Sequence, residues 1–199
     1  SMAASRPERL LAALALAAAA AVAGAQERTE LPIQLNASTT DFDYQNGRLR
    51  FGAITITQGE VKITAERAEA TGLDFKDSSW EFSGTVRITM PEAALASDSA
   101  RVRFSGGVIA TAMVTGAPAT FQQQREDQLA QGRANRIDYD LQRGTVELDG
   151  EAWLSDGKTE MTGGKLVYST ANQRVVSRDP VTITIQPNEP PAERPGPEP

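Results

Sequence analysis

Alternation of apolar and polar residues with a period of two is the feature that most constrains the fold of this chain. A period of two places apolar side chains on one face of a strand and polar side chains on the other. The pattern therefore predicts an all-β protein of many short antiparallel strands, each with one buried and one solvated face. The segments that alternate most clearly are residues 31–36, 48–57, 61–64, 86–90, 101–104, 137–141, 146–148 and 181–185.

Short turn signals separate these segments, and the order of strands and turns is weakly repeated. Asn46-Gly47 is a strong hairpin signal, because both residues tolerate positive φ. Units that cannot bury an apolar face alone must stack on one another, which would enclose a long apolar interior. The matching copies are residues 43–51 with 140–148 and 59–64 with 157–162, and a looser copy lies at 80–104.

Two stretches lack this alternation. Residues 122–134 carry no apolar stripe, so we interpret them as a loop. Residues 187–199 contain six prolines, which cannot donate the hydrogen bonds of a strand ladder. We expect this C-terminal segment to be a disordered tail.

The N-terminal segment has the features of a secretory signal peptide. A basic start precedes an apolar run at residues 10–22, and small residues follow at 23–25. A membrane-spanning helix needs roughly 20 apolar residues, so this run is short for an anchor. We expect residues 1–25 to be a signal peptide cut before Gln26, with Ser1 a remnant of cloning. An uncleaved anchor stays open as the alternative.

Composition excludes several classes of function. The chain has no Cys and no His, which excludes disulfides, Cys-ligated metal sites and Ser-His-Asp catalysis. Its net charge is −6, which argues against nucleic-acid binding because that requires a basic surface. We expect no cofactor and no metal.

Pairs of carboxylates keep one enzymatic hypothesis open. Asp41 with Asp43, and Asp138 with Asp140, each place two acids on one strand face. Such pairs suit a glycosidase or a calcium site. Sugar clefts are usually rich in aromatic residues, and this chain has only two Trp and three Tyr. We therefore interpret these acids as charges that keep a sheet surface soluble, and we expect no catalytic residues.

An ordered set of segments resembles the LptA/OstA family of periplasmic lipopolysaccharide transport proteins. No single motif is diagnostic, but the order is that of the family and covers most of residues 31–186. Residues 73–116 depart from it, because they read as an extra repeat where family members have a short connection. The segments that carry the likeness are 32–35, 47–68, 118–121, 134–141, 146–154, 164–168 and 181–185.

The resemblance implies a twisted β-jelly-roll, open at both ends, over residues 26–186. It further implies a periplasmic protein that is not an enzyme. Such a protein holds the acyl chains of lipopolysaccharide in an apolar groove and joins other copies head to tail. It passes the lipid from an LptC-like partner at the inner membrane to an LptD-like partner at the outer membrane. An LptC-like, membrane-tethered role in the same pathway is the alternative.

The resemblance also assigns lipid-binding positions. By motif match these are Ile33, Leu35, Phe121, Tyr139 and Leu141. The strand period of two supports an inward direction for Ile33 with Leu35 and for Tyr139 with Leu141. Ordinary core packing remains the alternative for each of the five. The arginines at positions 48, 50, 101 and 103 alternate with apolar residues and are expected to point outward.

Overall fold

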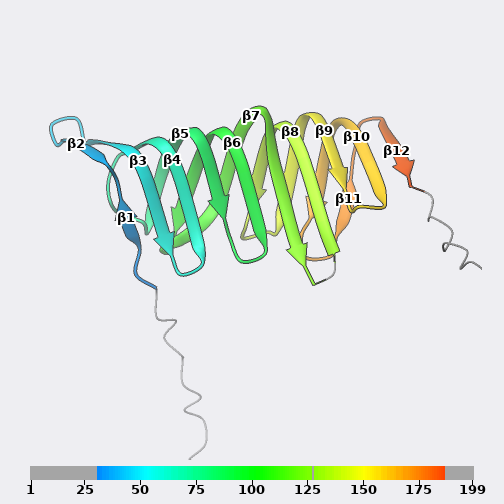
Figure 1. Ribbon diagram of the computed structural model, residues 1–199, viewed down its shortest axis with the longest axis horizontal. Helices are drawn as coiled ribbons and strands as arrows, with labels where there is room; N and C mark the ends of the chain where they lie inside the picture. The colour runs from blue at the N-terminus through cyan, green and yellow to red at the C-terminus, as the bar shows by residue number, and fades with distance from the viewer. Residues whose placement is uncertain (1–30, 127, 187–199) are drawn as a thin grey trace, which may run out of the picture. The chain divides into compact units, whose positions relative to one another are not determined.

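The computed structural model describes residues 31–126 and 128–186, and these residues form one antiparallel sheet of 12 strands (Figure 1). The expected signal peptide at 1–25 and the expected tail at 187–199 lie outside the described residues. The all-β prediction is confirmed. The strands are β1 (Gln34–Asn36), β2 (Thr39–Asp43), β3 (Arg48–Gln58), β4 (Val61–Ala70), β5 (Asp77–Thr89), β6 (Ala93–Ser105), β7 (Val108–Arg125), β8 (Gln128–Asp140), β9 (Thr145–Ser155), β10 (Thr159–Ser169), β11 (Arg174–Val176) and β12 (Val181–Ile185).

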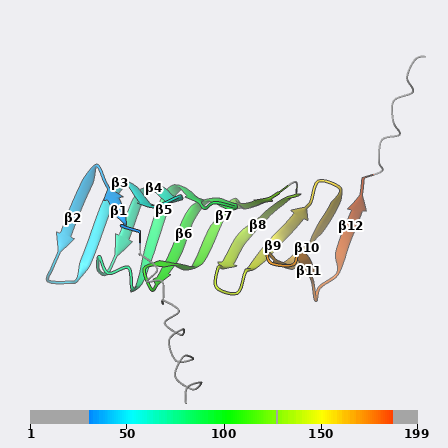
Figure 2. The same ribbon diagram turned by 90° about the horizontal axis from the view of Figure 1, so that it is seen from below.

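The strands follow one another through the sheet in chain order, as a meander of hairpins (Figures 1 and 2). Only the two ends of the sheet differ from this rule. At one end β1 and β2 both pair with β3, and at the other end β11 and β12 both pair with β10. Among the described residues there is no helix long and apolar enough to cross a bilayer.

A row of bulges folds the sheet into two layers. The pairing register slips near the middle of successive strands, from the β4–β5 pair through to the β9–β10 pair. A bulge bends its strand locally, so bulges aligned across neighbouring strands form a crease. We name the two layers half-sheet 1 and half-sheet 2. Half-sheet 1 holds residues 39–43, 48–52, 67–70, 77–83, 99–105, 108–115, 136–140, 145–149, 165–169 and 174–176. Half-sheet 2 holds residues 34–36, 54–58, 61–64, 86–89, 93–96, 119–125, 128–134, 152–155, 159–163 and 181–185.

The crease reverses which residues of a strand face inward. In β3, Leu49 and Phe51 are buried before the crease, and Ile54 and Ile56 are buried after it. An uninterrupted strand would bury only one of these two sets, because successive side chains alternate between faces. Both layers therefore point their apolar side chains into one shared core.

Aromatic side chains fill the core next to β5. Trp80 is fully buried, and its ring stacks on Phe75 at 5.1 Å and on Phe51 at 5.6 Å between centroids. Phe75 also meets the edge of Phe104 at 4.9 Å. Such pairs add about 0.5–1.5 kcal/mol each to the free energy gained by burying their area. This part of the interior is packed with aromatic rings.

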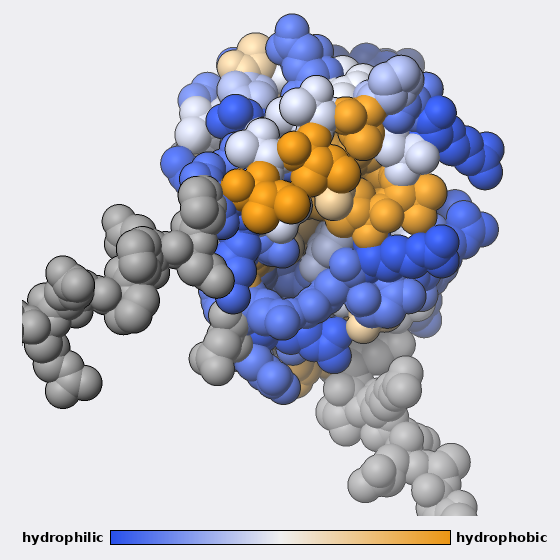
Figure 3. Space-filling view, turned by 90° about the vertical axis from the view of Figure 1, so that its right-hand side faces the viewer, coloured by the Kyte–Doolittle hydropathy of each residue, from blue (hydrophilic) through white to orange (hydrophobic). Residues whose placement is uncertain are grey.

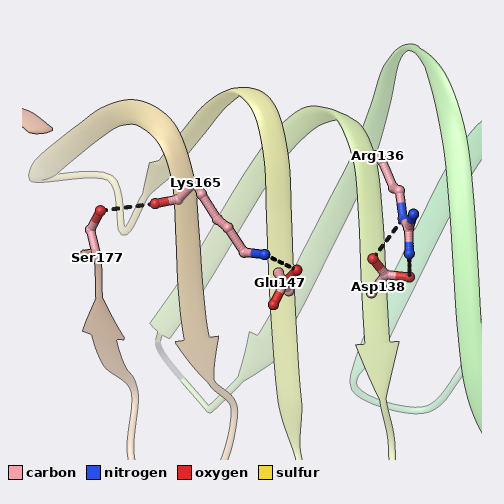
Figure 4. Close-up of polar contacts among 5 residues, drawn as sticks. All are labelled: Arg136, Asp138, Glu147, Lys165 and Ser177. Carbon is pink, nitrogen blue, oxygen red and sulfur yellow. Dashed lines mark hydrogen bonds and ion pairs between the residues drawn. The ribbon is translucent and has the colours of Figure 1, made fainter. Parts of the chain in front are cut away.

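The outer face carries charges, as predicted for Arg48, Arg50, Arg101 and Arg103, all of which are exposed. Arg50 lies 3.5 Å from both Asp41 and Glu69. Figure 4 shows two further ion pairs farther along the sheet. There the Arg136 guanidinium donates to Asp138, and Lys165 pairs with Glu147 across two strands. Exposed pairs of this kind contribute roughly 0–1 kcal/mol each, so they chiefly keep the surface soluble.

The internal repeat appears in two matching turns. The carboxylate of Asp43 accepts the Asn46 backbone N–H at 3.1 Å, and that of Asp140 accepts the Arg143 backbone N–H at 2.9 Å. Gly47 and Gly144 follow at φ 59° and 61°, a region that favours glycine. The β2–β3 and β8–β9 hairpins are therefore the same local structure.

Two sequence-based expectations need correction. Residues 122–134 are not a loop, because those that the structure describes form the end of β7 and the start of β8, which pair with each other. The strands are also not uniformly short, since β7 has 18 residues and passes through the crease. Residues 73–116 contain β5, β6 and the first part of β7, which pair continuously with the rest of the sheet.

Candidate functional site

The two half-sheets leave an opening between them along the strand ends farthest from the crease. We call this opening the mouth. A pocket of about 340 Å³, the mouth pocket, lies in it. Its lining includes Met90 and Ala93 from the half-sheet 2 side and Tyr139 and Leu141 from the half-sheet 1 side. A second pocket of about 310 Å³, the end pocket, lies nearer β11 and is lined in part by Met161.

Two of the five predicted lipid-binding residues line the mouth pocket, and a third packs against one of them. Tyr139 and Leu141 line it, and both pack against the shared core. Phe121 is buried in half-sheet 2, where its ring meets the edge of Tyr139 at 5.8 Å between centroids. The structure therefore brings Phe121 and Tyr139 together across the two layers.

The other two predicted residues lie elsewhere. Ile33 precedes β1 and Leu35 belongs to it, and Leu35 pairs with Ile56 of β3. Both side chains pack against the shared core, as their inward direction requires. Neither lines the mouth pocket or the end pocket. They mark one edge of the sheet.

Polar contacts join the two sides of the mouth. The Tyr168 hydroxyl donates to Gln123 Oε1 at 3.0 Å. Arg125 Nη1 donates to the backbone carbonyls of Thr170 and Ala171, at 3.4 Å each. Gln123 and Arg125 both line the mouth pocket and the end pocket, so these contacts stand between the two.

The sequence reasoning missed Gln123, Arg125 and Thr170. Gln123 takes an inward position of β7 that an apolar residue would normally occupy, and it is 5% exposed. The loop interpretation followed from the lack of an apolar stripe over residues 122–134. Phe121 and Gln123 are both buried and keep a period of two, but only the first is apolar.

The tyrosine hydroxyls at the mouth are neutral. Burial raises the pKa of Tyr168, and the nearby Arg125 guanidinium lowers it in part. Burial also raises the pKa of Tyr139, a hydrogen bond with Thr170 lowers it, and the Glu92 carboxylate raises it further. Both hydroxyls therefore remain hydrogen-bond donors at neutral pH.

The paired carboxylates each have a structural partner. Asp138 is bound by Arg136 at 2.8 Å, and Asp140 caps the β8–β9 turn. Asp43 caps the β2–β3 turn, where hydrogen bonds from Asn46 hold its pKa below the ordinary value of 3.8. A carboxyl with a lowered pKa is a poor general acid at neutral pH. Within residues 31–126 and 128–186, no group of three or more acidic residues is placed to hold a metal ion.

Apolar side chains are exposed at the end of the sheet formed by β11 and β12. Ile183 is 53% exposed and Ile185 is 73% exposed, although both alternate with threonine as in a half-buried strand. Figure 3 looks onto this end and shows hydrophobic residues gathered beside a hollow. Strand β12 therefore extends the wall of the interior beyond the end pocket, and its own apolar side chains are exposed.

Comparison with known proteins agrees with this architecture. Residues 67–174 match the family model described as LptA/(LptD N-terminal domain) LPS transport protein, which covers more than half of the chain and runs through residues 73–116. The lipopolysaccharide export system protein LptA of Escherichia coli K12 is 25% identical over 151 residues, and so is that of Shigella flexneri. The match covers 74% of this chain but only 64% of each relative's length.

A solved structure has the same fold. It is the crystal structure of LptH, the LptA-homologous periplasmic component of the lipopolysaccharide transport device of Pseudomonas aeruginosa. The TM-score is 0.52 at 17% identity, and the match covers 79% of this chain and 96% of LptH. The expected LptA-like, twisted β-jelly-roll is thereby confirmed. The chain belongs to the LptA/(LptD N-terminal domain) family of lipopolysaccharide transport proteins.

Proposed function

We propose that this protein binds the acyl chains of lipopolysaccharide between its two half-sheets and passes the lipid on toward the outer membrane. The observation that carries the proposal is the mouth pocket between the two layers, whose lining includes apolar side chains that pack against the shared core. A carrier of this kind needs an apolar trough and no reacting groups. Each methylene moved out of water is worth roughly 0.8 kcal/mol, so one long chain supplies on the order of 10 kcal/mol before ordering costs.

The mouth residues have different proposed roles from the edge residues. Tyr139 and Leu141 contact an acyl chain in the mouth pocket, and Phe121 forms the floor beneath them. Ile33 and Leu35 lie at the β1 edge, so they contact lipid only when it arrives from a neighbouring molecule. This division follows from which residues line the mouth pocket and which belong to an edge strand.

The two ends of the sheet support a proposal about partners. β1 and β2 form one edge, and β11 and β12 form the other. Edge strands can add a strand from another protein through their free backbone groups. Joining one edge to the opposite edge of a second copy gives a head-to-tail contact that extends instead of closing. The same edges would accept an LptC-like protein on one side and an LptD-like protein on the other.

The proposed location is the periplasm, reached through the signal peptide at residues 1–25. Intact mass of the exported protein tests this, because a chain that begins at Gln26 has been cleaved. A full-length mass would favour the LptC-like alternative, with an anchored N-terminus.

Transfer between two copies tests the proposed function itself. One copy is immobilised and loaded with fluorescent lipopolysaccharide, and a second copy is added in solution. The fluorescence should move to the soluble copy, and the rate should rise with its concentration. An equal loss of label into buffer or into serum albumin would contradict the proposal.

A further inference from the structure

Buried polar side chains of the described residues gather at one place in an otherwise apolar interior. They are Gln123, Ser155 and Thr170, which are 5%, 7% and 8% exposed. Gln123 lines both pockets, Ser155 lines the end pocket, and Thr170 lines the mouth pocket. Each has a partner within the protein: Gln123 accepts from the Tyr168 hydroxyl, Ser155 accepts from the Gly157 N–H, and Thr170 donates to the Gly144 carbonyl. The exposed Arg125 also lines both pockets. Together these residues form a polar rim beside the apolar interior, which suits the polar part of an amphipathic ligand.

Arg125 has hydrogen-bonding capacity left for a ligand. A guanidinium has five N–H donors, and the described contacts of Arg125 are two carbonyl oxygens at 3.4 Å, both from one nitrogen. Two arginines on the outer face have acidic partners instead. Arg101 pairs with Glu81, and Arg103 lies 3.3 Å from Asp77.

The end pocket is the side from which an anion can approach Arg125. Lys158 lines the end pocket, and its neighbour Asp156 directs Oδ1 at the backbone N–H groups of Lys158 and Thr159, at 2.9 and 2.7 Å. That carboxylate is therefore occupied by the β9–β10 turn. Each pocket has one acidic residue in its lining, Asp156 in the end pocket and Glu92 in the mouth pocket, but Asp156 lies beside Lys158 and its Oδ1 is engaged by the turn.

We propose that Arg125, assisted by Lys158 and Gln123, binds a phosphate of the lipid A part of lipopolysaccharide while the acyl chains lie in the apolar interior. The inference rests on the proposed function and adds a residue that recognises the headgroup. Arginine suits this role because its planar donors match two phosphate oxygens at once. The place also suits it, since Arg125 lies where the apolar interior meets solvent.

Binding of two lipids by four forms of the protein tests the proposal. The lipids are bis-phosphorylated lipid A and the same lipid with its phosphates removed. The proteins are the parent, R125Q, and the matched control R101Q on the outer face. Dissociation constants are measured by displacement of a fluorescent lipid, and circular dichroism checks that each variant is folded. A fourth protein, R125K, keeps the positive charge at this position. Binding that R125K recovers shows that the loss in R125Q comes from the missing charge and not from misfolding.

R125Q should weaken binding of the phosphorylated lipid about tenfold and leave the dephosphorylated lipid nearly unchanged. R125K should recover part of the loss, and R101Q should match the parent with both lipids. Equal weakening of both lipids by R125Q, or of neither, would overturn the role of Arg125. Binding of inorganic phosphate as tight as that of the phosphorylated lipid would overturn its assignment to a lipid headgroup. Failure of the parent to bind either lipid would instead overturn the proposed function.

Discussion

Replacement of Leu141 by Asp is expected to weaken lipopolysaccharide binding strongly. Leu141 lines the mouth pocket and packs against the shared core. Burying a leucine side chain is worth about 1.5–3 kcal/mol, which corresponds to a change in affinity of about tenfold to a hundredfold. The aspartate also places a carboxylate where an acyl chain would remove its water. The expected loss is therefore at least about tenfold.

Ile33→Asp is the matched comparison, because the sequence assigns Ile33 and Leu141 the same role. Ile33 lies beside edge strand β1 and does not line the mouth pocket. Its replacement should change the affinity of a single molecule by only about twofold, because it is away from the mouth pocket, but should slow transfer between copies. Both variants are assayed by fluorescent lipopolysaccharide titration, with thermal melts to confirm folding. A folded L141D protein that binds like the parent, or equal losses in L141D and I33D, would refute the reasoning.

Three further predictions address assembly, stability and pH. I183K places a charge on the uncovered edge strand β12 and should reduce concentration-dependent self-association in light scattering, whereas V108K, at a side chain of equal exposure away from the edges, should not. L148A removes a fully buried side chain and should lower the free energy of unfolding by about 2–5 kcal/mol in urea titrations, and a loss under 1 kcal/mol would contradict the packed core. The pKa of Asp43 is lowered by its hydrogen bonds with Asn46, so its contribution to stability is present above pH 3.8 and is lost as the pH falls through the lowered pKa. D43A should therefore be less stable than the parent at neutral pH, and the difference should close in acid; a difference that persists at pH 2 would argue against this linkage.

Strand identity could be predicted from the sequence because most strands bury an apolar face. Val102 and Phe104, or Val146 and Leu148, alternate with polar residues and are buried as predicted. The hairpin at Asn46-Gly47 followed from the same local chemistry. The outward direction of Arg101 between buried neighbours was predictable for the same reason.

The folding of the sheet into two layers could not be predicted from a period of two. The reversal between Phe51 and Ile54 coincides with Ala53, which has a positive φ of 46° and is skipped in the pairing of β3 with β4. Register slips mark the same crease in the strands that follow. Pro118, which has no N–H to donate, falls within such a slip between β7 and β8. Local alternation describes each half of a strand but does not say that both halves face the same core.

Of the residues at the candidate site, only apolar and aromatic ones were identified from the sequence. Phe121 and Tyr139 were identified through a family resemblance and are in contact. Gln123 and Arg125 were missed because polar residues on a strand normally indicate a solvated face or a loop. Their position at the mouth depends on contacts with Tyr168 and Thr170, which are 45 residues farther along the chain.

Native mass spectrometry of the exported protein with lipopolysaccharide tests the central claim most directly. The protein is incubated with a defined rough lipopolysaccharide, and with phosphatidylethanolamine as a control lipid, and then measured under non-denaturing conditions. The account predicts a complex whose added mass equals one lipopolysaccharide molecule per chain, reduced in L141D and absent with the control lipid. Only apo protein across the lipopolysaccharide concentration series, or equal adducts with both lipids, would contradict it.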